Sequence, residues 1–139
     1  MHFPERTVFI DFETTSLDVC SAEPIEVAAV AVRDGAVQDR FTSLIACSRR
    51  VPADATAVTG IDDGMLRDAP RPEQVARALD QFIGPSPVVA HNADYDLAML
   101  HRLSGTPFAG ALLDSCELAC VMRPDLRSHT LSALCEELG

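Results

Sequence analysis

The sequence predicts an α/β protein in which a five-stranded mixed sheet is flanked by helices. Two observations support this prediction. Three strand-like segments come first along the chain, and helical and strand-like segments then alternate. The length of 139 residues suits one domain, and the hydrophobic content of 47% is enough for a single core.

The first three strands are expected at 7–13, 24–34 and 36–46, where apolar and β-branched residues are concentrated. Asp34 and Gly35 stand between the second and third of these segments. This dipeptide is a strong signal for a two-residue hairpin turn. The three strands are therefore predicted to form an antiparallel meander.

The segment 51–70 is broken by proline and glycine, so short helical turns and loop are expected there. The next segment, 71–84, has the spacing of an amphipathic helix. Gly84 stands where a helix stop belongs. The predicted core-facing stripe of this helix is Val75, Leu79 and Phe82.

The last third of the chain alternates short strands with helices. Asn92 is a good N-cap for the helix at 92–105, and Ser128 is the expected N-cap of the final helix. The remaining predicted elements are strands at 87–90 and 110–114 and helices at about 115–122 and 129–138.

Net charge and composition exclude several classes of protein. The formal net charge is −10, which argues against a protein that binds nucleic acid mainly through its own positive charge. Two bound divalent cations would change that charge from −10 to −6. No stretch approaches the roughly 20 apolar residues of a membrane span, and the N-terminus lacks a signal-peptide pattern, so a cytoplasmic protein without a membrane partner is expected. The five cysteines include no C-x-x-C pair and are expected to be reduced.

Two acids in the first strand point to a possible chemical site. Asp11 and Glu13 in "VFIDFETTSLD" are two residues apart, so they project from the same face of a strand. Two carboxylates at this separation repel each other, and burying either without a partner is costly. A divalent cation or an arginine would compensate for the repulsion, and a frayed strand end in water would avoid it.

A second pair of acids opens the helix at 92–105. Asp96 shares a stripe with Met99, Leu100 and Leu103, so its side chain should point toward the core. Asp94 lies on another face and is expected to be solvated at the helix start. If the first and fourth strands are neighbours, Asp96 would join Asp11 and Glu13. Such a cluster suits one or two Mg²⁺ or Mn²⁺ ions and in-line displacement at phosphorus.

Several motifs resemble those of one enzyme family. "VFIDFETTSLD" resembles the first motif, and "VVAHNADYDLAML" the second, of the DnaQ-like, DEDD-type 3′→5′ exonucleases, the family of the proofreading epsilon subunit of bacterial DNA polymerase III. "AVTGIDDGMLRDAP" resembles the loop that lines their active site. "LLDSCELA" and "SHTLSALCEELG" are similar to the segments after the second motif, so the resemblance spans nearly the whole chain.

This resemblance implies a ribonuclease H-like fold and a two-metal site. Asp11 would bridge both ions, Glu13 would ligate the ion that holds the attacking water, and Asp96 would serve the second ion through water. The resemblance also implies contacts with the terminal nucleotide, with Leu17 as a wedge against the last bases. The substrate-binding residues are then predicted to be Thr14, Thr15, Leu17, Thr59, His91 and Asn92.

The C-terminal part departs from the family. Its third motif carries a His and an Asp five residues apart, or a Tyr in place of the His, and neither pattern occurs after residue 114. We therefore expect a domain truncated at its C-terminus, without the last helix. Losing a positioned general base typically costs about 10²–10⁴-fold in rate, so the 139 residues alone should be weakly active or inactive. The surface that the missing helix would cover is expected to favour self-association.

The sequence thus predicts a metal-dependent 3′→5′ exonuclease acting on single-stranded DNA or RNA ends, with a DNA polymerase subunit as a candidate partner. Two alternatives remain. One is a non-catalytic DnaQ-like module that binds nucleic acid or a polymerase, and the other is an RNA exonuclease similar to oligoribonucleases.

Overall fold

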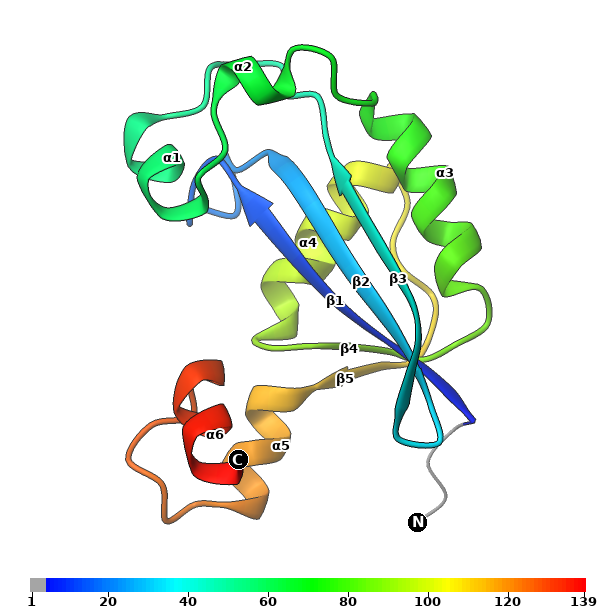
Figure 1. The fold of residues 1–139 in the computed structure, drawn as a ribbon, viewed down its shortest axis with the longest axis vertical. Coiled ribbons are helices and arrows are strands. Elements are labelled where there is room, and N and C mark those ends of the chain that lie inside the picture. The colour runs from blue at the N-terminus through cyan, green and yellow to red at the C-terminus, as the bar shows by residue number, and fades with distance from the viewer. Residues whose placement is uncertain (1–4) are drawn as a thin grey trace.

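The computed structural model describes residues 5–139 and contains a five-stranded mixed sheet with the strand order β3-β2-β1-β4-β5 (Figure 1). The first three strands pair antiparallel, whereas β4 pairs parallel with β1 and with β5. This confirms the predicted mixed sheet and its N-terminal meander. The strands are β1 (Arg6–Thr14), β2 (Pro24–Arg33), β3 (Ala36–Leu44), β4 (Val88–Ala90) and β5 (Leu112–Asp114).

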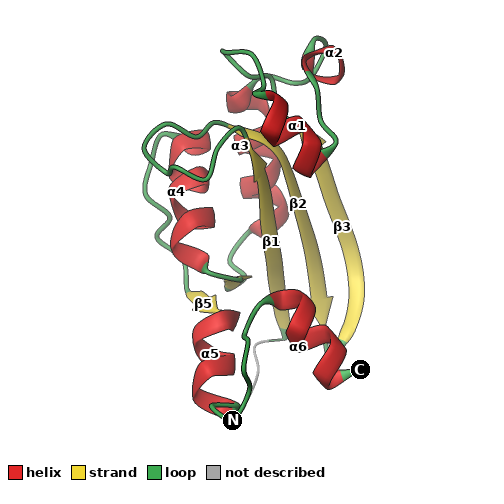
Figure 2. Cartoon of the chain, turned by 90° about the vertical axis from the view of Figure 1, so that its left-hand side faces the viewer, coloured by secondary structure: helices red, strands yellow, loops and turns green. Residues whose placement is uncertain are grey.

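The helices occupy three places around the sheet. Figure 2 shows α3 and α4 together on one side of the sheet, α1 and α2 across one of its ends, and α5 and α6 at the other end. None of the helices within residues 5–139 is long and apolar enough to cross a membrane. The helices are α1 (Ala53–Thr59), α2 (Asp63–Leu66), α3 (Pro72–Ile83), α4 (Ala93–Ser104), α5 (Ser115–Met122) and α6 (Leu131–Leu138).

The turn between β2 and β3 has the predicted form. Asp34 and Gly35 both adopt positive φ angles, 51° and 77°. Two positive φ values in succession define the tight turn whose twist matches antiparallel strands. This turn fixes the start of the β2–β3 register, which pairs Arg33 with Ala36.

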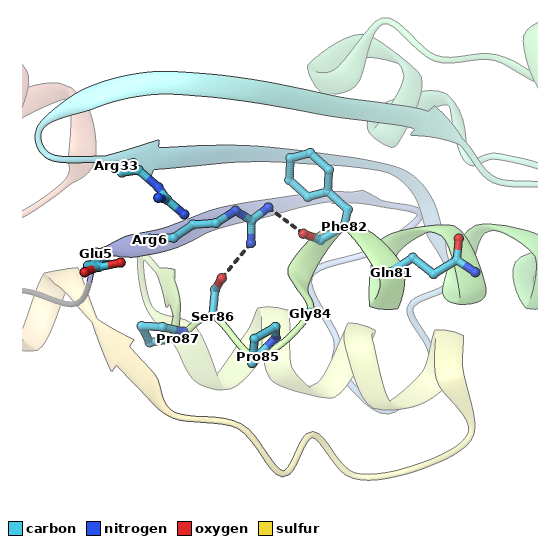
Figure 3. Close-up of a pocket in the computed structure, with 9 residues that line it drawn as sticks. All are labelled: Glu5, Arg6, Arg33, Gln81, Phe82, Gly84, Pro85, Ser86 and Pro87. Carbon is cyan, nitrogen blue, oxygen red and sulfur yellow. Dashed lines mark hydrogen bonds between the residues drawn. The ribbon is translucent and has the colours of Figure 1, made fainter.

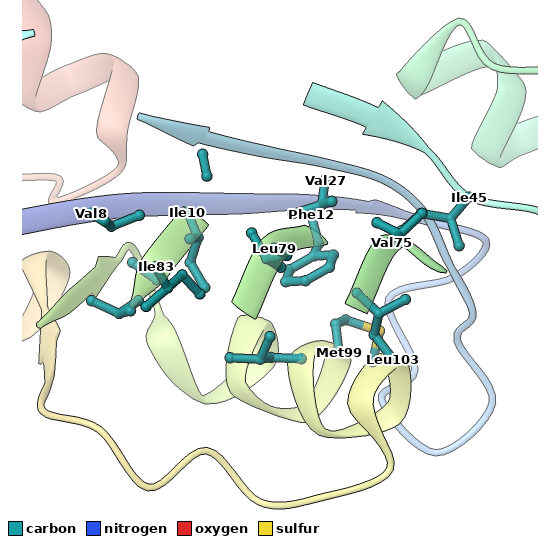
Figure 4. Close-up of a cluster of buried hydrophobic side chains, with 14 of the residues drawn as sticks. Val8, Ile10, Phe12, Val27, Ile45, Val75, Leu79, Ile83, Met99 and Leu103 are labelled. Carbon is teal, nitrogen blue, oxygen red and sulfur yellow. The ribbon is translucent and has the colours of Figure 1, made fainter. Parts of the chain in front are cut away.

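The core lies between the sheet and the α3–α4 layer (Figure 4). Residues Val8, Ile10 and Phe12 alternate along β1 and point into this core, as the two-residue period of a strand requires. Leu79 of α3 and Met99 of α4 meet them and are fully buried. Burying each of these side chains contributes roughly 1.5–3 kcal/mol.

The opposite face of the sheet is partly open. Phe9 of β1 and Leu113 of β5 are 43% and 40% exposed. Both are in register with Val89 of β4, so the three side chains form one row across this face. The same face of β1 carries Asp11 and Glu13, because they alternate with the core residues.

Some details of the predicted elements were wrong. Ile83 rather than Phe82 completes the buried stripe of α3, and Phe82 is half-buried against the ring of Phe41. The N-cap of α6 is Thr130 and not Ser128, because the Thr130 hydroxyl accepts a hydrogen bond from the Ala133 amide. The fifth strand is also two residues shorter than expected and begins at Leu112.

A hollow of about 500 Å³ lies where β1 begins and α3 ends (Figure 3). Its central group is the Arg6 guanidinium, which donates to the carbonyls of Phe82 and Ile83 and to the Ser86 hydroxyl at 2.6–2.9 Å. Carbonyls at a helix C-terminus need such donors. Arg6 therefore fastens the end of α3 to the sheet, which accounts for the polar lining of this hollow.

Candidate active site

A second cleft, of about 410 Å³, lies where β1 ends, and all nine predicted site residues line it. Strand β1, the loop after it, helix α1 and the β4–α4 connection form its walls. Residues that are far apart in the sequence therefore meet at one edge of the sheet. The predicted residues in this lining are Asp11, Glu13, Thr14, Thr15, Leu17, Thr59, His91, Asn92 and Asp96.

The topology of the sheet explains why the end of β1 is accessible. Strand β4 ends at Ala90, and its pairing with β1 extends only to Phe9. Beyond Phe9, the edge of β1 on that side is free of a strand, and the β1–β2 register shifts between Glu13 and Thr14. This part of β1 can therefore be reached by side chains from α4.

Asp96 reaches this edge from α4. Its side chain is buried, with the residue only 5% exposed, and its Oδ1 accepts a hydrogen bond from the Phe12 amide at 3.2 Å. That amide lies between Asp11 and Glu13 in the chain, so Asp96 approaches the pair predicted from the sequence. The inward orientation deduced from helical phase is confirmed, as is the exposure of Asp94.

The pKa values of the three acids are all raised above their ordinary values. Burial raises the pKa of Asp96 to about 7, and the charge of Asp11 adds to that effect. Partial burial also raises the pKa of Asp11, a residue that remains exposed to solvent, although the nearby His91 ring partly offsets this shift. For Glu13, burial and then the charges of Asp11 and Glu26 raise the pKa. Asp11 therefore interacts with both other acids.

The residues of the cleft fit divalent cations by donor chemistry. Three carboxylates with raised pKa values offer hard oxygen ligands, and no arginine is among the described residues that line the cleft. Within residues 5–139, however, no three His, Cys, Asp or Glu side chains are gathered closely enough to hold a metal ion by themselves. The acids share one cleft without closing around a single point.

His91 presents one ring nitrogen as an acceptor. Its Nδ1 is 3.0 Å from the Ser115 hydroxyl, and that hydroxyl donates its only proton to the Ala90 carbonyl. His91 Nδ1 must then be the donor to Ser115, which leaves Nε2 unprotonated in the neutral ring. Nε2 is buried and has no hydrogen-bond partner among the described residues.

Asn92 occupies the predicted N-cap position of α4, but Asp114 performs the capping. The Asp114 carboxylate accepts from the amides of Asn92 and Ala93 at 3.2 and 2.8 Å, and it also caps α5 through the Cys116 amide. Asn92 itself has a left-handed backbone with φ of 60° and makes no side-chain cap. One carboxylate thus fixes the starts of two helices, and Asn92 faces the cleft.

The three predicted threonines use their hydroxyls internally. Thr14 Oγ1 is 2.6 Å from the Tyr95 hydroxyl, and Thr15 Oγ1 accepts from the Glu23 amide. Thr59 is the last residue of α1, and its Oγ1 donates to the Ala55 carbonyl one turn earlier. These bonds shape the walls of the cleft.

Leu17 forms an apolar lip of the cleft. It is 93% exposed although it is a large hydrophobic residue. Val58 of α1, which the sequence analysis did not single out, lines the same cleft and is also strongly exposed. Tyr95 also lines the cleft, and its hydroxyl contacts the Ser16 carbonyl of the loop that carries Leu17.

Comparisons with known proteins agree on one family. The family model described as "Exonuclease" (RNase_T) matches residues 8–139. PolC-type DNA polymerase III of Bacillus cereus is 34% identical over 140 residues, and that of Thermotoga maritima is 34% identical over 136 residues. These alignments cover 96% and 95% of the chain but only 10% of each relative, so the chain spans about a tenth of their length.

Solved structures share the fold. Exonuclease X, in complex with 5′-overhanging duplex DNA, has a TM-score of 0.79 at 26% identity, over 94% of this chain and 72% of that one. Exonuclease I of E. coli, in complex with a dT13 oligonucleotide, has a TM-score of 0.81 at 18% identity, over 96% of this chain and 35% of that one.

Proposed function

The chain belongs to the RNase_T family of exonucleases and has the DnaQ-like, ribonuclease H-like fold, and from this premise we propose that it removes nucleotides from 3′ ends by two-metal phosphodiester hydrolysis. The observation that carries the proposal is the hydrogen bond from the Phe12 amide to Asp96. It brings an acid of α4 to the segment of β1 that holds Asp11 and Glu13.

Asp11, Glu13 and Asp96 are the residues proposed to hold two Mg²⁺ or Mn²⁺ ions. Divalent ions at such a site polarise a phosphoryl oxygen and lower the pKa of bound water. The raised pKa values of the three acids support this assignment, because a nearby cation would favour their ionised forms.

The other residues of the cleft would bind and orient the strand end. Leu17 and Val58 offer apolar surface to the terminal bases, and base stacking on such surface does not depend on sequence. Asn92 and the backbone at Thr14 and Thr15 would contact the terminal nucleotide, with Thr59 supporting the wall made by α1. His91 Nε2 would accept a hydrogen bond from the bound nucleotide.

We propose a replicative DNA polymerase as the setting of this activity. The relatives are PolC-type DNA polymerases III, of which the chain matches one segment. The acidic chain would then rely on metal ions and on the polymerase to hold DNA. RNA is the alternative substrate, because an RNA exonuclease similar to oligoribonucleases would use the same three acids.

The test is cleavage of a 5′-labelled oligonucleotide with Mg²⁺ or Mn²⁺. The proposal predicts a ladder that shortens from the 3′ end, no cleavage in EDTA and no cleavage of circular single-stranded DNA. DNA and RNA strands of one sequence, run in parallel, identify the substrate. Cleavage that persists in EDTA, or in an Asp11→Ala variant, would reject the proposal.

A slow reaction is expected from the 139-residue chain. His91 is the only histidine among the described residues that line the cleft, and no His–Asp pair with the third-motif spacing follows residue 114. Without a positioned general base, the rate should be lower by about 10²–10⁴-fold. Long incubations at high enzyme concentration are therefore part of the assay.

A second candidate is a non-catalytic module that binds nucleic acid or a polymerase. It is favoured by the open arrangement of acids, since no three metal-ligating side chains within residues 5–139 are gathered around one point. This candidate predicts DNA binding without cleavage and no uptake of Mn²⁺ at millimolar concentration.

Self-association through the open sheet face is also proposed. Phe9 and Leu113 lie in one row on that face and are well exposed. Sedimentation velocity of the chain and of a Phe9→Ser variant tests it: a dimer that the substitution dissociates supports the proposal, and a monomer at all concentrations rejects it.

A further inference from the structure

The loop between β1 and β2 carries Leu17, and two hydrogen bonds between Thr15 and Glu23 close the neck of this loop. The Thr15 amide donates to the Glu23 carbonyl, and the Glu23 amide donates to Thr15 Oγ1, both at 3.0 Å. Within the loop, Asp18 accepts from the Cys20 amide and from the Ser21 hydroxyl. These local bonds give the loop a shape but do not fix its position over the cleft.

Two residues of helix α4 hold the loop in its position over the cleft. Near its start, the Tyr95 hydroxyl contacts the Ser16 carbonyl and Thr14 Oγ1. Two turns later, the Arg102 guanidinium donates to three carbonyls of the same loop, those of Val19, Cys20 and Ala22, with the first two at 3.0 and 3.2 Å. Residues seven apart lie on one face of a helix, so both contacts come from the same side of α4.

Leu17 stands between these two anchor points in the chain. Ser16 precedes it and Val19 follows it, and both carbonyls are held by α4. Asp96 belongs to the same helix and is adjacent to Tyr95. The helix that brings the third acid to β1 therefore also fixes the apolar lip of the cleft.

A surface arginine near a helix C-terminus often serves only to offset the helix dipole. Arg102 does more, because its guanidinium reaches a segment about 80 residues away and satisfies three carbonyls there. A planar guanidinium can reach several acceptors at once, whereas a lysine presents a single ammonium.

We infer that Arg102 is a positioning residue for the proposed exonuclease, acting through the loop 16–22 to hold Leu17 against the terminal base of the substrate. This inference rests on the proposed function for its role in binding a strand end. Its structural part, the fixing of the loop by Arg102, stands on the hydrogen bonds alone.

The structural part is tested by amide hydrogen exchange in an Arg102→Gln variant, with His101→Gln as the matched control. His101 is the exposed neighbour on the same helix, and its side chain makes no hydrogen bond among the described residues. We expect exchange in residues 16–22 to rise about tenfold in Arg102→Gln, because loss of two or three such bonds removes that much protection, and to stay unchanged in residues 88–100. Unchanged exchange in the loop would overturn the inference. Should Arg102→Gln unfold throughout, Arg102→Lys is measured in the same way and decides the question.

The functional part is tested by a double-mutant cycle with Leu17→Ala in the oligonucleotide assay. If Arg102 acts through Leu17, Arg102→Gln should raise KM with kcat unchanged, and adding it to Leu17→Ala should change KM no further. Additive effects, or a loss confined to kcat, would overturn the positioning role. An inactive parent chain would reject the proposed function, and the exchange result would still be decided separately.

Discussion

The acids of the cleft and Glu23 both lie near the end of β1, and they differ in the hydrogen bonds that the protein donates to them. In the cleft, Asp96 receives one hydrogen bond from the Phe12 amide, and burial raises its pKa to about 7. At the neck of the β1–β2 loop, burial acts in the same direction on Glu23. Hydrogen bonds from the Ser48 amide, Arg49 and the Ser48 hydroxyl nevertheless lower the pKa of Glu23 to about 2.

The difference lies in the donors that the protein supplies. Glu23 has a complete set from its own chain, so it serves the structure and fastens the loop to the segment before α1. The acids of the cleft lack such a set and repel one another through Asp11. Acids that repel one another and receive few hydrogen bonds favour binding of a cation from solution.

The largest effect is expected for Asp11→Asn, which removes the acid that interacts with both others. Loss of groups that only support metal ligands costs about 10–100-fold, so loss of a ligand itself should lower exonuclease activity by more than about 100-fold. Activity of the variant is compared with that of Asp39→Asn, an exposed acid of β3. Equal activities of the Asp11→Asn and Asp39→Asn variants would show that the cleft acids take no part in cleavage.

A large effect is also expected on the pH dependence of stability. Between its unfolded pKa of 3.8 and its folded pKa of about 7, Asp96 holds a proton in the folded state that the unfolded chain has released. Metal-free protein should therefore lose stability as pH rises from 4 to 7, by about 2–4 kcal/mol at most. Denaturant unfolding of Asp96→Asn should show this slope removed, and an unchanged slope would contradict the cause assigned here.

Glu23 should behave in the opposite way. Its folded pKa is lowered from 4.5 to about 2, so its stabilisation is present above pH 4.5 and is lost as pH falls toward 2. Glu23→Gln should cost about 1–2 kcal/mol at pH 7, a value reduced because Arg49 is largely exposed. Chemical denaturation at pH 7 and at pH 3 measures this, and a cost at pH 3 as large as that at pH 7 would contradict it.

The smallest effect is expected for Asp94→Asn. Asp94 lies two residues from Asp96 on α4 but is exposed. Its substitution should change stability by less than about 0.5 kcal/mol and leave activity intact. A loss of activity comparable to that of Asp96→Asn would mean that the helix start, rather than the cleft, holds the important charge.

The central features of the site could be predicted from the sequence because they follow from local periods. The two-residue period of a strand placed Asp11 and Glu13 on one face, and the 3.6-residue period of a helix turned Asp96 inward. A mixed sheet then brought the ends of β1 and β4 together. Each step required only neighbouring residues and one rule of topology.

The supporting contacts could not be predicted, because they depend on how distant segments approach each other. Asp114 caps α5 directly after it in the chain, but its second role at α4 requires β4 and β5 to pair. Arg49 donates a hydrogen bond to Glu23, which lies 26 residues earlier in the chain. The hydrogen bonds of Arg102 also join distant segments, because its three acceptors lie in the β1–β2 loop.

The most direct test of the metal site is a calorimetric titration of Mn²⁺ into the chain at pH 8, beside the Asp11→Asn variant. This pH lies above the pKa of Asp96, which is about 7, so saturable binding at millimolar Mn²⁺ or below is predicted for the parent and not for the variant. No heat of binding from a folded parent, or equal binding by both proteins, would contradict the claim that these acids are kept together for a cation.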